Sequence, residues 1–98
     1  MDYKDYNYKL YQTDADYMFR AYDESKFNFD RDYKLVYSDR VRCGDGSDLG
    51  AVAELLYMIW NSDRRPATAH ARSMSVSDVV EIEGVKFYCE PTGFKEIK

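Results

Sequence analysis

The residues best suited to chemistry lie in the segment Ser73–Val80, which reads SMSVSDVV. Three serines at alternate positions precede Asp78, and a serine hydroxyl near a carboxylate is one component of a nucleophilic site. Such a site also needs a positioned base and a third group that orients the base, and the sequence supplies neither here. We therefore interpret this segment as a turn ahead of a strand. In such a turn the side chains of Ser73, Ser75, Ser77 and Asp78 would accept hydrogen bonds from nearby backbone N–H groups.

The other reactive residue types do not form a catalytic or metal-binding pattern. His70 is the single histidine, and neither Cys43 nor Cys89 is spaced to join it in a ligand cluster. The segment Gly44–Ser47 resembles a phosphate-binding loop before a helix, but it lacks the G-K-[ST] ending and carries Asp45, whose charge repels phosphate. We predict that the protein is not an enzyme, and that it has no metal site and no cofactor.

The cysteines and the apolar residues indicate the compartment. Cys43 and Cys89 are far apart and form no C-x-x-C pair, which favours reduced thiols in a cytosolic protein over a disulfide. No apolar run approaches the roughly 18 residues of a membrane span. Residues 1–16 contain no apolar stretch typical of a signal peptide. We expect a cytoplasmic protein with no membrane contact.

Tyrosine is the unusual feature of the composition, with ten residues in a chain of 98. Many of them crowd the first quarter of the chain, namely Tyr3, Tyr6, Tyr8, Tyr11, Tyr17 and Tyr22. Acids are interleaved with them: up to Asp32 there are eight acids and five bases, a balance of −3 within a total of −4. Tyrosine suits interfaces because it has an apolar body and a polar tip.

Carboxylates spaced among aromatic rings can imitate a phosphate backbone with its bases, and so attract a positively charged nucleic-acid channel. On this interpretation the partner-binding residues are Asp14, Asp16, Asp23, Glu24, Asp30 and Asp32, with contact area from Tyr11, Tyr17 and Tyr22 and from whichever of Tyr3 and Tyr6 are exposed. The partner would be a larger protein with a basic surface. The alternative is that the tyrosines fill a half-buried sheet face and that the acids are ordinary solvated charges.

A second set of residues allows a different function. Five arginines could converge as a basic patch that contacts phosphate, namely Arg40, Arg42, Arg64, Arg65 and Arg72. The sequence SVSDV is also loosely similar to the v-G-D-v turn of RNA-binding PUA-like domains. A nucleic-acid-binding accessory module using Arg64, Arg65 and Arg72 is therefore the alternative function, although the negative net charge argues against direct nucleic-acid binding.

The length of 98 residues and the hydrophobic content of 45% indicate one domain, residues 1–98, with one core. Periodicity predicts elements in the order β-α-β-α-β-β. In the first half these are a strand at Tyr6–Gln12, a short helix at about Ala15–Asp23 and a strand at Tyr33–Val41. In the first strand Tyr6, Tyr8 and Leu10 share one face. The helix would be capped by Thr13 or Asp14, and Phe27 and Phe29 would flank a loop.

The main helix is expected at Asp48–Asn61, capped by Ser47 and ended by Pro66 beyond it. Its apolar stripe is formed by Leu49, Val52, Ala53, Leu56, Ile59 and Trp60. The last elements are strands at Val76–Ile82 and Val85–Cys89, joined by a hairpin at Glu83-Gly84, and a short edge at Phe94–Ile97. The pattern predicts an α+β fold, a mostly antiparallel sheet with one main helix packed on a face.

Three sequence blocks occur in a recognisable order: AELLYMIWNSDRRP at Ala53–Pro66, then SMSVSDVVEI, then YCEPTGFKEI. Together with YKLYQ at Tyr8–Gln12 and YKLVYS at Tyr33–Ser38, they resemble the YodL-like domain family. The resemblance implies a protein of a conjugative element or phage of Firmicutes, and it supplies no catalytic motif. With the acidic, tyrosine-rich composition, it favours a non-enzymatic inhibitor of a host-defence nuclease, of anti-CRISPR or anti-restriction type, over a nucleic-acid-binding module or a small enzyme.

Overall fold

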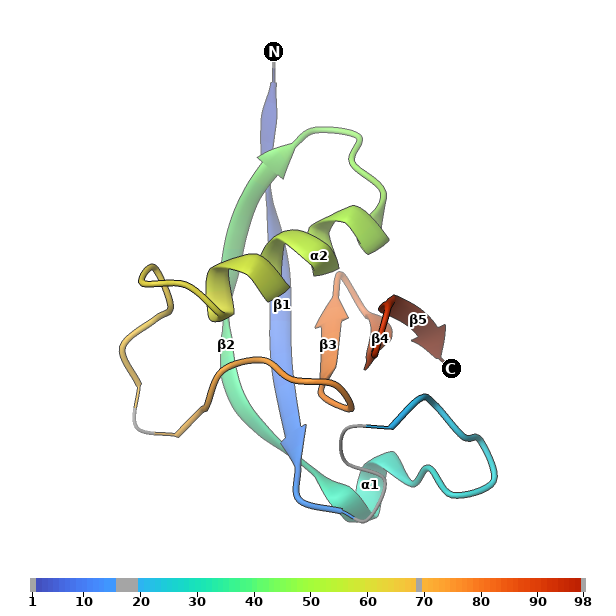
Figure 1. Cartoon of the computed structure of the whole chain (residues 1–98). Helices are drawn as coiled ribbons and strands as arrows, with labels where there is room; N and C mark the ends of the chain where they lie inside the picture. The colour runs from blue at the N-terminus through green and yellow to red at the C-terminus, as the bar shows by residue number, and fades with distance from the viewer. Residues whose placement is uncertain (1, 16–19, 69, 98) are drawn as a thin grey trace.

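The structure, a computed structural model, describes residues 2–15, 20–68 and 70–97. It contains one five-stranded antiparallel sheet with the strand order β2-β1-β3-β4-β5 (Figure 1). Along the chain the elements are β1 (Tyr3–Thr13), α1 (Phe29–Asp32), β2 (Tyr33–Gly44), α2 (Leu49–Trp60), β3 (Val79–Ile82), β4 (Val85–Glu90) and β5 (Gly93–Ile97). The predicted α+β class is confirmed, and helix α2 lies across one face of the sheet as expected.

Strand β1 lies between β2 and β3 and connects the two halves of the chain. It pairs with β2 along its whole length and with β3 from Tyr8 to Tyr11. The predicted face is correct, because Tyr6, Tyr8 and Leu10 are all buried in the core beneath α2. Both β1 and β2 are longer than the alternation of apolar and polar residues indicated, and their register shifts between Leu10 and Tyr11.

Helix α2 packs on the sheet through the predicted apolar stripe. Its buried residues are Val52, Ala53, Leu56 and Trp60. The helix begins differently from the prediction: Asp48, not Ser47, is the N-cap, and its carboxylate accepts a hydrogen bond from the Ala51 N–H at 3.1 Å. The Ser47 hydroxyl instead donates to the Gly44 carbonyl at 2.6 Å, which closes the turn that leaves β2.

The hairpin between β3 and β4 forms at the predicted dipeptide. Glu83 and Gly84 have positive φ values of 50° and 85°. Positive φ at both central positions is the mark of a type I′ turn, whose twist matches that of two antiparallel strands. The turn fixes the register in which Val79 faces Tyr88 and Val80 faces Phe87.

The opposite face of the sheet carries a second hydrophobic cluster that the prediction of a single core did not anticipate. Its buried members are Val79, Tyr88 and Ile97. Half-buried side chains from the connection between β1 and β2 cover them, namely Ala15, Tyr22, Phe27, Phe29 and Tyr33, together with Tyr11. The sheet is therefore packed on both faces at this end, which gives the surplus tyrosines an interior to fill.

The short helix predicted at Ala15–Asp23 is wrong in the residues that can be compared. Ala15 and residues 20–23 are not helical, and residues 16–19 lie outside the described residues. The helix of this connection is α1, a single turn whose N-cap Asn28 accepts from the Arg31 N–H at 3.0 Å. The reason is tertiary: the ring of Tyr22 packs edge-on against Tyr88 at 5.4 Å, so the aromatic residues serve the sheet rather than a helix stripe.

Candidate functional site

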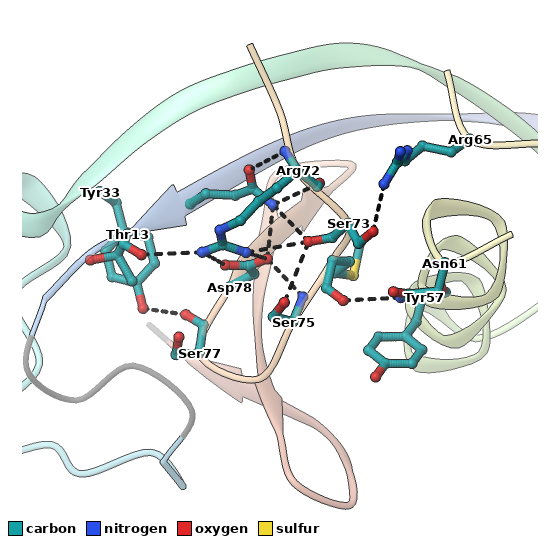
Figure 2. Close-up of polar contacts among 12 residues, drawn as sticks. Thr13, Tyr33, Tyr57, Asn61, Arg65, Arg72, Ser73, Ser75, Ser77 and Asp78 are labelled. Atoms are coloured by element: carbon teal, nitrogen blue, oxygen red, sulfur yellow. Dashed lines mark hydrogen bonds and ion pairs between the residues drawn. The ribbon is translucent and has the colours of Figure 1, made fainter. Parts of the chain in front are cut away.

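The polar side chains around the serine-rich segment converge on one buried carboxylate, that of Asp78. Asp78 is 1% exposed. The two terminal nitrogens of the Arg72 guanidinium donate hydrogen bonds to it, at 2.9 Å to one carboxylate oxygen and 3.0 Å to the other (Figure 2). The Gln12 side-chain amide donates to it at 2.9 Å and the Ser75 N–H at 2.8 Å. These donors satisfy a charge that would otherwise be strongly unfavourable in the interior.

Burial dominates the electrostatics of this carboxylate. Desolvation raises the pKa of Asp78 above its usual value, although the hydrogen bonds from Arg72 and from the Ser75 N–H act in the opposite direction. The Arg72 side chain remains 37% exposed, so one partner of the pair reaches solvent while the other does not. Desolvation of the buried carboxylate offsets much of the Coulombic gain from such an ion pair, so the pair is weak evidence for added net stability.

The same residues connect three parts of the fold. Gln12 on β1 donates to the Arg72 carbonyl at 3.1 Å, and its side-chain oxygen accepts from the Arg72 N–H at 3.1 Å. Arg72 also donates to the Thr13 carbonyl at 3.1 Å. At the end of α2, the Asn61 side chain donates to the Met74 carbonyl at 3.0 Å. The segment before β3 is thereby fixed to both β1 and α2.

Residues 75–78 form a turn, so β3 begins at Val79 and the predicted start of this strand at Val76 is wrong. The Asp78 N–H donates to the Ser75 carbonyl at 3.0 Å, and Ser77 has a φ of 83°, which identifies a type II turn at the position that glycine normally takes. The Ser77 carbonyl accepts a short hydrogen bond from the Tyr33 hydroxyl. The Ser77 hydroxyl is buried and has no partner among the described residues. The motif is therefore a turn, as predicted, while its contacts with Arg72 and Gln12 were missed.

The predicted partner-binding acids occupy two places. Asp14 is exposed just beyond the end of β1. Asp23, Glu24, Asp30 and Asp32 belong to residues 20–32, which contain four acids and three bases and are called the acidic segment below. Figure 1 shows this segment beyond the end of β5. Asp23, Glu24 and Asp30 are exposed there, whereas Asp32 is half-buried and paired with Arg31 at 2.7 Å. Asp16 and Tyr17 lie outside the described residues.

The acidic segment is firmly attached to the sheet. The Tyr88 hydroxyl donates to the Arg20 carbonyl at 2.6 Å, and the Tyr22 N–H donates to the Glu90 carboxylate at 3.1 Å. A turn follows in which Asp23 accepts hydrogen bonds from the Ser25 hydroxyl and N–H, and these bonds lower the pKa of Asp23. The exposed carboxylates therefore belong to a segment that is itself packed against the sheet.

The predicted tyrosines are mostly not free for contact. Tyr11 packs edge-on against Phe29 at 4.8 Å, and Tyr22 lies against Phe27 at 5.1 Å. Burial raises the pKa of both tyrosines. Tyr6 is only 3% exposed, so the expectation that it could belong to an exposed contact surface is wrong, because it fills the core beneath α2. Tyr3, at 63%, is exposed.

The structure gives the predicted arginines different surroundings. Arg72 is engaged with Asp78, as described above, and Arg65 donates to the Ser73 hydroxyl. Arg64 is exposed after the end of α2. Arg40 and Arg42 lie on the edge strand β2, where Arg42 pairs with Asp5 at 3.1 Å. A role for Arg64, Arg65 and Arg72 in nucleic-acid contact stays a prediction.

The metal-ligating residue types and the cysteines do not gather in the described part of the chain. Within residues 2–15, 20–68 and 70–97, no three His, Cys, Asp or Glu side chains gather where they could hold a metal ion. Neither cysteine forms a disulfide, and burial raises the pKa of the Cys89 thiol to about 12. None of the helices found in the same residues has the length and apolar character needed to cross a membrane. The absence of catalysis and of a cofactor remains a prediction.

Comparison with known proteins gives one match. The model of a family described as the YodL-like domain matches residues 4–98, which is nearly the whole chain. No curated protein and no solved structure matches the chain. The match includes the buried Asp78 turn, helix α2 and the acidic segment.

Proposed function

The chain belongs to the YodL-like domain family, and we propose that it acts as a non-enzymatic interaction protein that binds a basic surface on a larger partner. The contact surface is Asp14 together with the exposed carboxylates of the acidic segment. The observation that carries the proposal is that Asp23, Glu24 and Asp30 are exposed on a segment anchored by aromatic rings and hydrogen bonds.

Anchoring matters because binding usually costs conformational entropy. A loop that is already fixed loses less freedom when it binds, so more of the electrostatic attraction appears as affinity. In the acidic segment, Tyr22 and Phe27 pack against Tyr88 of the sheet. The aromatic residues therefore contribute indirectly, by holding the carboxylates in place, which replaces the idea that most of these rings touch the partner.

The partner class that we propose is a host-defence nuclease, of CRISPR or restriction type, whose nucleic-acid site is occupied by the acidic surface. The resemblance to domains of phages and conjugative elements supplies the biological setting, since such elements meet host nucleases. A nucleic-acid channel supplies the charge complementarity, because it is built to attract a polyanion. The protein would compete with DNA or guide RNA for that channel.

The test begins with a pull-down from a bacterial host lysate and identification of the bound protein by mass spectrometry. Binding to that partner is then measured for Glu24→Lys/Asp30→Lys, and the matched control is Asp45→Lys/Asp63→Lys, which reverses two exposed acids elsewhere. We expect the first variant alone to associate more slowly, and wild-type binding to weaken as salt rises past about 0.15 M, where the screening length is about 8 Å.

A competition assay with nucleic acid distinguishes the proposed nuclease inhibitor from a nucleic-acid-binding module. On the proposal, the protein and DNA or guide RNA exclude one another from the nuclease. If the isolated chain instead binds DNA or RNA, and substitution of Arg64, Arg65 or Arg72 removes that binding, the protein is a nucleic-acid-binding accessory module. Equal binding by the two double variants would also refute the proposal, because position in the acidic segment would then have no effect.

A further inference from the structure

Helix α2 is apolar on the side that faces solvent as well as on the side that faces the sheet. Its twelve residues include a single charged one, Glu54. Met58 is 68% exposed and Tyr57 is 38% exposed, and the half-buried Leu55 lies on the same helix. A surface helix normally carries charged or polar residues opposite its buried stripe. Exposed apolar side chains that gather in one place are typical of a binding surface.

Glu54, Tyr57 and Met58 form one wall of a groove, called the α2–β5 groove below. The other wall is the turn from β4 into β5, and the groove has a volume of about 210 Å³. Tyr57 and Phe94 meet edge to face across it, with ring centroids 6.3 Å apart. The volume is smaller than the roughly 300–1,000 Å³ of small-molecule sites, which suits a single large apolar side chain.

The charges at the groove have one sign. Among its described lining residues the charged ones are Glu54 and Glu90, and no cation accompanies them. Glu90 is held in place because its carboxylate accepts the hydrogen bond from the Tyr22 N–H at 3.1 Å. Because that bond engages the Glu90 carboxylate, Glu54, which is exposed on α2, is the carboxylate that an incoming cation can meet. An apolar hollow with an exposed carboxylate at its margin is complementary to an apolar side chain that is followed or preceded by a cation.

We propose that the α2–β5 groove binds a segment of a partner protein in which a large apolar side chain stands next to Lys or Arg. The apolar side chain would enter between Tyr57, Met58 and Phe94, where the flexible thioether of Met58 can adapt its shape. The cation would lie at Glu54, because the Glu90 carboxylate is already engaged by the Tyr22 N–H. The groove includes none of the exposed carboxylates of the acidic segment, so this inference does not depend on the function proposed above.

A second copy of the chain is a poorer occupant on electrostatic grounds. A symmetric dimer through this groove would bring the same surface of two copies together. Glu54 would then be present on both sides of a partly desolvated contact, and the described residues of the groove include no cation to offset it, so like charges oppose association. The groove therefore favours a partner of different composition.

The experiment follows the backbone amide signals of the full ¹⁵N-labelled chain by NMR during titration with a helical peptide of leucine and lysine, in which the leucines form one face. A peptide of the same pattern with glutamate in place of lysine is the charge control. We expect saturable shifts at Glu54, Met58 and Phe94 with the lysine peptide, and much weaker ones with the glutamate peptide. Met58→Glu should weaken binding by about tenfold or more.

The matched control is Leu35→Glu, which changes another exposed apolar residue, 51% exposed on the distant edge strand β2, and should leave peptide binding unchanged. A thermal melt of both variants shows that they are folded. The proposal is overturned if the glutamate peptide binds equally well, or if Met58→Glu and Leu35→Glu have the same effect. It is also overturned if sedimentation shows a dimer that Met58→Glu dissociates, because a second copy would then occupy the groove.

Discussion

Replacing Arg72 with methionine tests whether the ion pair with Asp78 organises the turn before β3. Methionine keeps an unbranched apolar stem and removes only the guanidinium. Asp78 would lose the two hydrogen bonds at 2.9 Å and 3.0 Å and keep those from Gln12 and the Ser75 N–H. Its side chain, 1% exposed, could not gain solvent in compensation.

The expected cost follows from this geometry. Removing one partner of a buried ion pair costs about 3–5 kcal/mol, because a charge is left without compensation in the interior. The Arg72 side chain is 37% exposed and Asp78 retains two donors, so the pair is partly screened. We therefore expect a loss near the lower end, about 3 kcal/mol in the free energy of unfolding at neutral pH.

The dependence of this loss on pH has a definite sign. Desolvation already raises the pKa of Asp78 in the folded protein, and removal of Arg72 raises it further. A carboxyl with a raised folded-state pKa destabilises the folded state above that pKa and has no effect below its unfolded value of about 3.9. The deficit of Arg72→Met relative to wild type should therefore shrink as pH falls from neutral toward about 4.

Urea denaturation followed by circular dichroism at several pH values measures both quantities. Arg65→Met is the matched control, because Arg65 is exposed and donates a hydrogen bond to the Ser73 hydroxyl rather than to a buried charge. The reasoning is refuted if Arg72→Met is as stable as wild type at neutral pH, or if its deficit is the same at every pH. Either result would mean that Asp78 does not depend on Arg72 for its charge.

Three further predictions concern the core helix, the turn before β3 and the two thiols. Leu56→Ala, at a position 1% exposed, should cost roughly 2–5 kcal/mol in thermal or urea unfolding, while Met58→Ala changes stability by no more than about 0.5 kcal/mol. Ser77→Gly should raise the unfolding free energy by about 1 kcal/mol, because it removes a positive-φ side chain and a buried hydroxyl without a described partner; a destabilised variant would contradict this. With a thiol reagent near pH 8, half-buried Cys43 should react in the folded protein and Cys89 should not, since its pKa is about 12; equal labelling would refute the assignment.

The elements that the sequence predicted well are those whose determinants are local. Helix α2 follows from an apolar stripe at 3.6-residue spacing, and the structure buries Val52, Leu56 and Trp60 of that stripe. The β3–β4 hairpin follows from Glu83-Gly84, which adopts the two positive φ values that a type I′ turn needs. Both elements can be predicted from local sequence without knowing the tertiary contacts of the rest of the chain.

The connection between β1 and β2 was misassigned because its aromatic residues pack against residues that are distant in sequence. Tyr22, Phe27 and Phe29 cover Val79 and Tyr88, which lie fifty or more residues away in sequence. A stripe that could fit a short helix equally fits an irregular segment that lies on a sheet. Periodicity over so few residues cannot distinguish the two, since tertiary packing overrides local preference.

The partners of Asp78 were unpredictable for a related reason. Gln12 reaches Asp78 across 66 residues, so no local pattern reveals the contact. A weaker signal existed in Arg72, which stands six residues before an aspartate that opens an apolar strand. Because an aspartate in such a position must be compensated if it is buried, a nearby arginine is a natural candidate for its partner.

The second hydrophobic cluster changes what the composition says about function. Tyrosines such as Tyr11 and Tyr22 are half-buried among aromatic rings, so their abundance reflects a sheet packed on both faces. The exposed residues Glu24, Asp30 and Met58 make little contribution to either core. Substitutions at these three positions should leave the fold intact, so a binding defect in such a variant can be attributed to a lost contact with the partner. An anchored segment with exposed carboxylates and a largely apolar helix face are thus two described surfaces on which a partner can bind without competing with the requirements of folding.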